Sequence, residues 1–288
     1  MKPTLTLLAS IPLLLSAAAN AFAQITAAKD GPIVYGHHHL NTTNVEAQKK
    51  FFVDTLGGTV VKIGAGNTEV VKFPNVLIFF RTVQSPPGGS RGTTVNHIGF
   101  SVPNLRAAVD KVKANGFQMI TKTEAAPDRE VKDDIAGPAQ PGGASIAFVL
   151  APDDLKVELV EQRQQTIPIT LHHVHFFNPK NVDMQAWYVK TFGAKSRTGG
   201  AFPAGDLPGV ALNFSPSPDA VVGTQGRALD HVGFEVKNLE AFLKKLEAQG
   251  TKIDVPFRQV PALNITLAFI TDPWGTYIEM TEGLDKVP

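Results

Sequence analysis

Two segments of the chain alternate apolar and polar residues in nearly the same pattern. Val95–Val102 has the sequence VNHIGFSV, and Leu229–Val236 has the sequence LDHVGFEV. Because side chains alternate across a strand, each segment predicts a strand with one apolar face and one face that carries a histidine and a glycine. A helical stretch follows each strand, at 104–116 and 238–250. Each stretch begins at Asn and ends at Gly, which favour a helix N-cap and a helix stop.

A weaker repeat precedes each of these segments. Residues 36–58 and 172–193 both contain a histidine-rich strand, a helix with aromatic residues, and a terminal glycine. The order weak, strong, weak, strong indicates four copies of one unit. Short β-rich runs follow the helices, so each copy predicts a strand, a helix and about three further strands. These runs are 76–82, 145–150, 156–160, 210–214, 265–270 and 277–281.

The predicted architecture is α+β, with four βαβββ modules paired into two domains. Since consecutive modules are adjacent in the chain, we place the first two in an N-terminal domain, 24–165, and the last two in a C-terminal domain, 166–288, with the boundary near Gln165. Proline- and glycine-rich stretches separate the modules within each half. The segment 126–143 has no counterpart of similar length in the fourth module, and we expect a long surface loop there.

The N-terminal residues have the pattern of a secretory signal peptide. A charged start precedes an apolar run at 5–19 and the small-x-small sequence Ala21-Phe22-Ala23. The apolar run is shorter than the roughly 20 residues that a membrane-spanning helix needs. We therefore expect residues 1–23 to be removed and the mature chain to be periplasmic or secreted, with no membrane contact after cleavage.

Composition narrows the partners and the chemistry. The formal net charge is +1 and both signs are scattered, which argues against the basic surface that nucleic acid binding requires. The chain has no cysteine, so disulfides and cysteine-ligated metal centres are excluded. Any metal must then be held by histidine and carboxylate side chains. A small molecule is the expected partner, and the sequence leaves the oligomeric state open.

The histidine faces of the predicted strands form the candidate site. His97 and His231 lie opposite apolar residues that can pack on the following helix. The last strand of each half places a glutamate between two apolar residues, Val157-Glu158-Leu159 and Ile278-Glu279-Met280, and this alternation puts it on the histidine face. Each half then offers two histidines and one glutamate. The predicted sets are His37, His97 and Glu158 in the N-terminal half, and His173, His231 and Glu279 in the C-terminal half.

Two imidazoles and one carboxylate that leave other positions open form a metal site suited to Fe²⁺, Mn²⁺, Zn²⁺ or Ni²⁺. The open positions admit substrate oxygens or water, which the metal polarises. In the alternative interpretation, each histidine is an ordinary strand residue bonded to a neighbour, and each glutamate lies on an exposed surface. Because the same set recurs in both halves, we favour one divalent metal ion per active site.

The motif His-(Val/Ile)-Gly-Phe-x-Val, the helix that ends in Gly, and the closing segment Asp272–Glu279 (DPWGTYIE) resemble the vicinal oxygen chelate superfamily. This superfamily includes glyoxalase I, methylmalonyl-CoA epimerase, type I extradiol dioxygenases and bleomycin-resistance proteins. The resemblance covers nearly the whole mature chain. It implies paired βαβββ modules whose mixed sheets curl around a metal-containing cavity, with ligands on the first and last strands of the modules. The alternation of side chains along the predicted strands leads independently to the same ligand positions.

The register of the two histidine-rich strands is open. His39 lies two residues beyond His37 on the same strand face, and His175 has the same relation to His173. Either could replace or support its neighbour as a ligand. The other histidines of these strands, His38 and His172, are expected to point away.

The resemblance implies three metal ligands rather than four. Four-ligand members add a carboxylate or amide from the closing strand of the first module, and the corresponding residues here are Phe79 and Asn213. A three-ligand site and a layout of four modules in two domains are similar to type I extradiol dioxygenases. In those enzymes only the C-terminal half keeps its metal, so we expect the C-terminal set to be the working one.

One departure weakens the assignment to ring-cleaving enzymes. The extradiol signature has a histidine and then a tyrosine ahead of its Asp-Pro-x-Gly segment, whereas here Phe269 occupies the tyrosine position and no histidine follows His231. Acid–base assistance must then come from other residues. The candidates are Tyr188, Tyr277, Arg258 and His175.

Three functions compete. The favoured one is glyoxalase-like lyase or isomerase chemistry beside a carbonyl that the metal polarises. The second is extradiol-type ring cleavage, and the third is non-catalytic binding of a small molecule, as in bleomycin-resistance proteins. The presence of two ligand sets counts against the third function. Export counts against glutathione or coenzyme A thioesters as substrates.

Overall fold

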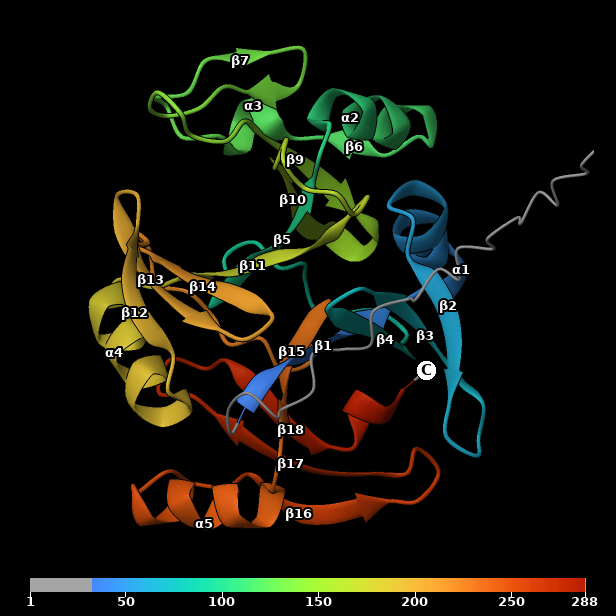
Figure 1. Cartoon of the computed structure of the whole chain (residues 1–288), viewed down its shortest axis with the longest axis vertical. Coiled ribbons are helices and arrows are strands. Elements are labelled where there is room, and N and C mark those ends of the chain that lie inside the picture. The colour runs from blue at the N-terminus through green and yellow to red at the C-terminus, as the bar shows by residue number, and fades with distance from the viewer. Residues whose placement is uncertain (1–32, 288) are drawn as a thin grey trace, which may run out of the picture.

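The computed structural model describes residues 33–287, which form two curled mixed sheets with helices packed against them (Figure 1). The predicted signal peptide, residues 1–23, lies outside the described residues. Between residues 33 and 287, no helix combines the length and the apolar character needed to cross a membrane.

The first two predicted modules are present. The first contains β1 (Ile33–Thr42), α1 (Val45–Lys49), a π-helical segment η1 (Lys50–Thr55), β2 (Thr59–Ile63), β3 (Thr68–Phe73) and β4 (Val76–Thr82). The second contains β5 (Val95–Val102), α2 (Leu105–Ala114), β6 (Gln118–Met119), α3 (Thr121–Glu124), β7 (Val131–Lys132), β8 (Ile135–Ala136), β9 (Ile146–Ala151), the 3₁₀ turn η2 (Pro152–Asp154) and β10 (Leu155–Glu161).

The last two modules follow the same plan. The third contains β11 (Thr170–Phe177), α4 (Asn181–Phe192), β12 (Lys195–Gly199), β13 (Phe202–Leu207) and β14 (Val210–Ser215). The fourth contains β15 (Leu229–Val236), α5 (Leu239–Ala248), β16 (Val255–Val260), β17 (Ile265–Thr271), β18 (Tyr277–Glu282) and the 3₁₀ turn η3 (Leu284–Lys286). The α+β class and the four-module plan are therefore confirmed.

The predicted helix boundaries after the two strong repeats are confirmed. The side chains of Asn104 and Asn238 each accept a hydrogen bond of 3.0 Å from the backbone N–H three residues further on. Gly116 and Gly250 end the helical segments with φ values of 84° and 82°. A residue with a Cβ would be strained in this left-handed conformation, which is why a glycine ends each helix.

The segment 126–143 differs from the predicted surface loop. It contains the short β7–β8 hairpin, and Ala136 of β8 pairs with Ile146 of β9 and is fully buried. This segment therefore extends the edge of a sheet and contributes to a small apolar cluster.

The modules do not pair in the order predicted from the chain. In the described residues, one sheet has the strand order β16-β17-β18-β15-β1-β4-β3-β2, which joins the first and fourth modules. The other has the order β12-β13-β14-β11-β5-β10-β9-β8-β7, which joins the second and third modules. The predicted pairing of consecutive modules in 24–165 and 166–288 is therefore wrong.

The connections between modules explain this pairing. The link 162–169 between β10 and β11 is short, and β11 runs antiparallel beside β5 in the same sheet as β10. The third module therefore extends the sheet of the second module. β1 and β15 are then left to pair with each other, with Leu40 opposite Leu229 and Ile33 opposite Val236. Two distant parts of the chain thus build one sheet.

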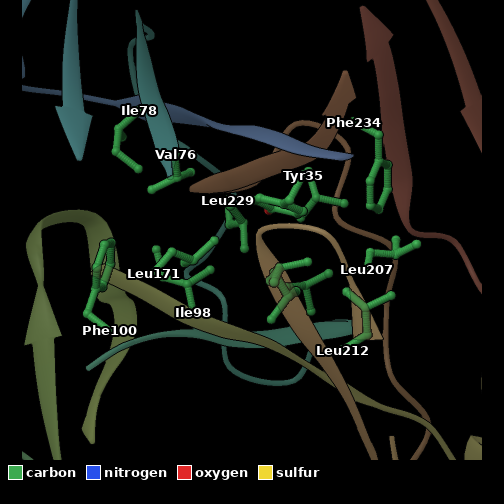
Figure 2. Packing of buried hydrophobic residues seen from close by; sticks show 14 of the residues in the cluster. Tyr35, Val76, Ile78, Ile98, Phe100, Leu171, Leu207, Leu212, Leu229 and Phe234 are labelled. Carbon is green, nitrogen blue, oxygen red and sulfur yellow. The ribbon is translucent and has the colours of Figure 1, made fainter. Parts of the chain in front are cut away.

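The two sheets share one apolar core. Figure 2 shows side chains of β1, β4 and β15 meeting side chains of β5, β11, β13 and β14. Phe100 of β5 is fully buried and its ring lies 4.8 Å from that of Phe73 and 6.4 Å from that of Phe52, measured between centroids. On the opposite side, Phe192 of α4 stacks on Phe234 of β15 at 4.8 Å. The aromatic residues of one sheet therefore stabilise the other.

Because of this shared core, we expect the chain to unfold as one cooperative unit. Phe100→Ala should lower the free energy of unfolding by about 3–5 kcal/mol, the typical cost of removing a buried aromatic side chain. Phe257→Ala is the control, since Phe257 is 40% exposed, and its cost should stay within about 0.5 kcal/mol. Urea unfolding followed by circular dichroism and by tryptophan fluorescence measures both. Two separate transitions in the wild-type protein would contradict the shared core.

Candidate metal centre and its cavity

The six predicted ligands gather in two clusters, but not in the predicted sets. His37 of β1 meets His231 of β15 and Glu279 of β18, and we call this group the cavity cluster. The other three predicted ligands form the second group with one further histidine, and we call it the four-residue cluster. It contains His97 of β5, Glu158 of β10, and His173 and His175 of β11. The predicted grouping by halves is wrong because the modules pair across the halves.

The cavity cluster converges on one carboxylate oxygen. Glu279 Oε2 lies 2.9 Å from His37 Nε2 and 2.8 Å from His231 Nε2. All three side chains are buried. The other ring nitrogen of His231, Nδ1, is 2.6 Å from Asp230 Oδ1, which orients the ring. Three donor atoms thus face one point at the centre of the first sheet.

Glycines opposite the histidines fix the register that the sequence left open. Gly233 is paired with His37, and a Cβ built on it would collide with the imidazole ring. Gly99 is paired with His173 in the same way, and a Cβ there would collide with that ring. The glycine of each His-x-Gly motif therefore makes room for the histidine of the neighbouring strand. This geometry brings His37 and His173, the residues first predicted, into the clusters.

The remaining histidines of these strands have different surroundings. His39 does not join the cavity cluster; its ring stacks on Phe79 at a centroid distance of 5.9 Å, and its buried Nε2 has no hydrogen-bond partner. His38 points away, as predicted, and its Nδ1 lies 2.8 Å from the hydroxyl of Tyr35. His172 also stays outside the clusters, and its Nδ1 lies 2.9 Å from Nδ1 of His173, the ring nitrogen that does not face Glu158.

Burial and the close contacts within the cavity cluster shift the pKa values of Glu279 and His231. Burial raises the pKa of Glu279, but the charges of His37 and His231 and their hydrogen bonds lower it well below its usual range. Burial lowers the pKa of His231, but the hydrogen bonds to Asp230 and Glu279 outweigh it, and the pKa is raised above 6.5. Burial and the neighbouring charges of His231 and His37 lower the pKa of His39 to about 3.

Burial is the largest cause of the pKa shifts of two histidines in the four-residue cluster. Burial and the charge of Lys156 lower the pKa of His97 to about 3. Burial and the charges of His97 and His173 lower the pKa of His175 well below its usual range. The single carboxylate, Glu158, has its Oε2 2.8 Å from His97 Nε2 and 3.2 Å from His173 Nε2.

A cavity of about 610 Å³ opens on the cavity cluster. Its walls combine apolar side chains, mainly from β4, β16, β17 and η3, with two arginines, Arg81 and Arg258. Arg81 is held by a hydrogen bond of 2.8 Å from its Nε to Asn41 Oδ1, and its Nη2 lies 3.5 Å from Asp230 Oδ2. The apolar lining residues are Phe79, Val255, Val260, Leu263, Ile265, Leu267, Phe269 and Leu284.

Two of the four catalytic candidates line this cavity, whereas His175 belongs to the four-residue cluster and Tyr188 lies in the core. Tyr277 and Arg258 are both in the lining, and the ring of Tyr277 stacks on Phe269 at 4.7 Å. Tyr188 is fully buried among aromatic rings, and its hydroxyl donates to Asp272 Oδ2 at 3.1 Å. Tyr188 was therefore wrongly predicted as a catalytic candidate; on the amphipathic helix α4 it faces the core.

Asp230 is a site residue that sequence reasoning missed. Strict alternation along β15 would place its side chain on the face opposite His231. The β1–β15 pairing skips a residue between Leu229 and His231, and this bulge lets the carboxylate reach the neighbouring ring. Asn96 bonds His97 in the same way, with its Oδ1 2.9 Å from Nδ1. The signal available in the sequence was the oxygen-bearing residue before the histidine in both strong repeats.

Comparison with known proteins agrees with this architecture. Two stretches of the chain, residues 34–148 and 137–280, match the model of the Glyoxalase/Bleomycin resistance protein/Dioxygenase superfamily. The chain belongs to this superfamily. The matches cover nearly all of the described residues, and they include both clusters.

The individual proteins that the chain is similar to match it over a short stretch or at low sequence identity. Lactoylglutathione lyase from Escherichia coli is 35% identical over 72 residues, which are 25% of this chain and 44% of that enzyme, so the match spans less than half of the relative's length. Glyoxalase I from Zea mays superposes with a TM-score of 0.65 at 16% identity, over 88% of this chain and 94% of that chain. A putative dioxygenase from Bacillus subtilis gives 0.62 at 13% identity, over 88% and 86%. These two structural matches show that the chain has the same fold as those proteins.

The donor set of the cavity cluster fits a divalent metal. Metal–ligand bonds of about 2.0–2.2 Å place neighbouring donors about 3 Å apart, close to the 2.8 and 2.9 Å observed around Glu279 Oε2. The bond from Asp230 to the outer nitrogen of His231 is the arrangement that orients histidine ligands of metals. Three protein donors leave further positions that face the cavity.

A test of this geometry is to fill the space beside one histidine at a time. Gly233→Ala should displace His37 and weaken metal binding at the cavity cluster by at least about 10–100-fold, since orientation of a ligand is worth that much. Gly99→Ala is the matched variant, because it crowds His173 and should leave the cavity cluster intact. Isothermal titration of the metal-free proteins with Zn²⁺ measures both effects. Unchanged affinity at the cavity cluster in Gly233→Ala would contradict the role of His37.

A second buried carboxylate holds the C-terminal segment that closes one side of the cavity. Oxygens of Glu235 accept hydrogen bonds from the Thr281 hydroxyl at 2.7 Å and from the backbone N–H groups of Gly283 and Leu284 at 2.5 and 3.1 Å. Burial raises the pKa of this carboxyl to about 7. Leu284 is part of the cavity wall, so Glu235 fixes the position of that wall.

The raised pKa of Glu235 gives a pH dependence of stability. The contribution of the Glu235 carboxyl to the stability of the fold is complete below about pH 4.3, the pKa of a glutamate in the unfolded chain. It is lost as the pH rises through about 7. Glu235→Gln keeps one acceptor oxygen for the N–H groups of Gly283 and Leu284, offers an N–H to the Thr281 hydroxyl as the protonated acid would, and removes the charge. It should therefore stabilise the protein above pH 7 by on the order of 2–3 kcal/mol. It should change little near pH 4.5. Urea unfolding at both pH values checks this, and an equal effect at both would contradict it.

Proposed function

We propose that this chain is a metal-dependent enzyme of its superfamily that catalyses glyoxalase-like lyase or isomerase chemistry on a small oxygenated substrate. The single observation that carries this proposal is the convergence of His37, His231 and Glu279 at a cavity of about 610 Å³. The similarity to lactoylglutathione lyase and the fold shared with glyoxalase I support the same chemistry.

The metal has one role in this proposal. A divalent ion held by His37, His231 and Glu279 would polarise a substrate carbonyl, so that a neighbouring C–H bond becomes acidic enough to lose its proton. Zn²⁺ and Ni²⁺ suit this role, and Fe²⁺ or Mn²⁺ suit the same donor set.

His39 is placed to accept the proton. It lines the cavity beside the cluster, and its Nε2 has no hydrogen-bond partner. Because burial keeps its pKa low, the ring is neutral at neutral pH and Nε2 is available as an acceptor. The hydroxyl of Tyr277 stays protonated, since burial raises its pKa, and it is therefore a hydrogen-bond donor in the same cavity.

The cavity wall selects the kind of substrate. Its apolar side chains exclude water and fit a hydrophobic group, while Arg81 and Arg258 offer positive charge to an oxygen-rich or anionic end. A small oxygenated compound with an apolar part satisfies both requirements.

Extradiol-type ring cleavage is the second candidate. The observation in its favour is the ligand number, because Phe79, beside His39, is in the place where a four-ligand site would need an oxygen donor. The layout of consecutive domains, which also favoured it, is absent because the first and fourth modules share one sheet. Phe269 faces His231 where an acid–base tyrosine would be needed.

The proposed enzyme is exported. The N-terminal pattern of the sequence supports a periplasmic or secreted enzyme whose first 23 residues are removed. Mass spectrometry of the protein from culture medium and periplasm would show a mature chain beginning at Gln24. Recovery of the full-length chain from the cytoplasm would contradict export.

The reaction class is decided by two assays on the protein loaded with Zn²⁺, Ni²⁺, Fe²⁺ or Mn²⁺. Exchange of solvent deuterium into 2-oxoaldehyde hemithioacetals and hydroxyketones reports proton transfer, and oxygen uptake with catechols reports ring cleavage. We expect deuterium exchange, and we expect Glu279→Gln to lose it together with the metal of the cavity cluster. Oxygen uptake without exchange would establish the second candidate, and binding without either would establish a non-catalytic protein.

His39 provides a sharper prediction. His39→Gln should lower kcat for proton transfer by about 100-fold or more, the usual contribution of a positioned base, while the bound metal is unchanged because His39 is outside the cluster. His38→Gln, on the opposite face of the same strand, is the control and should keep kcat. Steady-state kinetics with elemental analysis measures both. If His39→Gln keeps its full rate, another residue accepts the proton.

A further inference from the structure

The four-residue cluster offers more donors than the cavity cluster. Around His97 Nε2 lie Glu158 Oε2 at 2.8 Å, His175 Nδ1 at 3.1 Å and His173 Nε2 at 3.3 Å. His173 Nε2 is also 3.2 Å from Glu158 Oε2. Tetrahedral zinc with bonds of about 2.0–2.1 Å separates its ligand atoms by about 3.3 Å. Four of the six distances among the three imidazole nitrogens and the carboxylate oxygen are therefore close to tetrahedral spacing, and all four atoms lie within 4.8 Å of one another.

The outer nitrogens of all three rings are held by other side chains. Asn96 Oδ1 lies 2.9 Å from His97 Nδ1 and can only accept, so in a neutral His97 ring the proton is on Nδ1 and the lone pair of Nε2 faces the cluster. His175 Nε2 is 2.8 Å from Ser215 Oγ, and His173 Nδ1 is 2.9 Å from His172 Nδ1. Fixing the outer nitrogen is how proteins orient histidines that bind metal through the inner one.

Protonation of these side chains does not give every one of the four donor atoms a hydrogen-bond partner. The lone pair of His97 Nε2 faces two imidazole nitrogens and a carboxylate oxygen at once, and a proton on one of these atoms relieves only the contacts of that atom. All four side chains are buried, so water does not compensate. A divalent cation at the centre would be bound by all four atoms, and each donor would then face a positive charge.

His39, the counterpart of His175 in the first sheet, does not join the cavity cluster. His39 occupies the position in β1 that His175 occupies in β11, because each is paired with the histidine of the neighbouring strand, His231 or His97. Phe79 stacks on His39, whereas the residue paired with His175 from β14 is Asn213. The cavity cluster thus has three donors and a cavity, and the other has four donors.

We propose that His97, Glu158, His173 and His175 form a structural zinc site that clips β11 to β5 and β10 and joins the third module to the second. A closed set of four protein ligands distinguishes structural zinc from catalytic zinc, which keeps an open position. The rings of Phe148, Phe177 and Phe202 lie 5.0–6.2 Å from His97 or His175 and surround the site. This role is separate from the catalytic metal proposed at the cavity.

The test uses the full chain with the cavity cluster disabled by Glu279→Gln, so that only the second site is measured. We expect this variant to bind one Zn²⁺ per chain by elemental analysis after dialysis. At about 100 times the dissociation constant, Zn²⁺ should raise the melting temperature by about 5 °C or more. Co²⁺ in place of Zn²⁺ should give the intense visible absorption of four-coordinate cobalt.

Two double variants separate the fourth ligand from general damage. Adding His175→Ala to Glu279→Gln should lower Zn²⁺ affinity at least about 100-fold, reduce the thermal shift and turn the cobalt spectrum to the weak bands of higher coordination. Adding His39→Ala, the equivalent histidine of the other cluster, should leave all three readouts as in Glu279→Gln alone. His175→Gln repeats the first test if His175→Ala does not fold.

Two results would overturn the proposed structural zinc site. A Glu279→Gln protein that binds no Zn²⁺ would overturn the second site. One Zn²⁺ per chain with affinity and cobalt spectrum unchanged by His175→Ala would overturn the four-ligand structural role. Neither result depends on catalytic activity, so failure here and failure of the proposed enzyme chemistry are distinguishable.

Discussion

The antiparallel pairing of β1 with β15 is the constraint on which the cavity cluster depends. It sets His37 opposite Gly233, and the parallel pairing of β15 with β18 sets Glu279 opposite the same glycine from the other side. A slip of one residue in either register would turn the ligand to the opposite face of the sheet. The metal geometry is therefore a property of sheet register, and the glycine that makes room for the imidazole is part of it.

The same arrangement is repeated in the second sheet with different side chains. Gly99 lies opposite both His173 and Glu158, as Gly233 does opposite His37 and Glu279. Around this shared frame, one site has Phe79 and a cavity, and the other has Asn213 and an additional histidine in reach. The duplicated module therefore supplies the positions, while a few neighbouring residues decide how many donor side chains reach each site.

Much of this could be predicted from the sequence, because the information is local. Alternation along each strand identified the histidine and glutamate faces, and the repeats identified four modules. The pairing of modules was predicted wrongly, since periodicity says nothing about which free strand edges meet. The bulge that turns Asp230 toward His231 was also invisible, because it arises from two strands of different modules. Tyr188 was misplaced for a related reason: its partners Phe176 and Phe214 come from strands that only the fold assembles.

One difference between the repeats contributes to the opposite pKa shifts of His231 and His97. The residue before the central histidine is Asp230 in one and Asn96 in the other, and the bulge brings both side chains to Nδ1 of that histidine. A carboxylate stabilises the protonated ring, so the pKa of His231 is raised, whereas the neutral amide leaves burial and the charge of Lys156 to lower the pKa of His97. In the cavity cluster, a metal would therefore compete with a proton for His231. In the four-residue cluster it would meet a neutral ring whose inner lone pair is already exposed to the site.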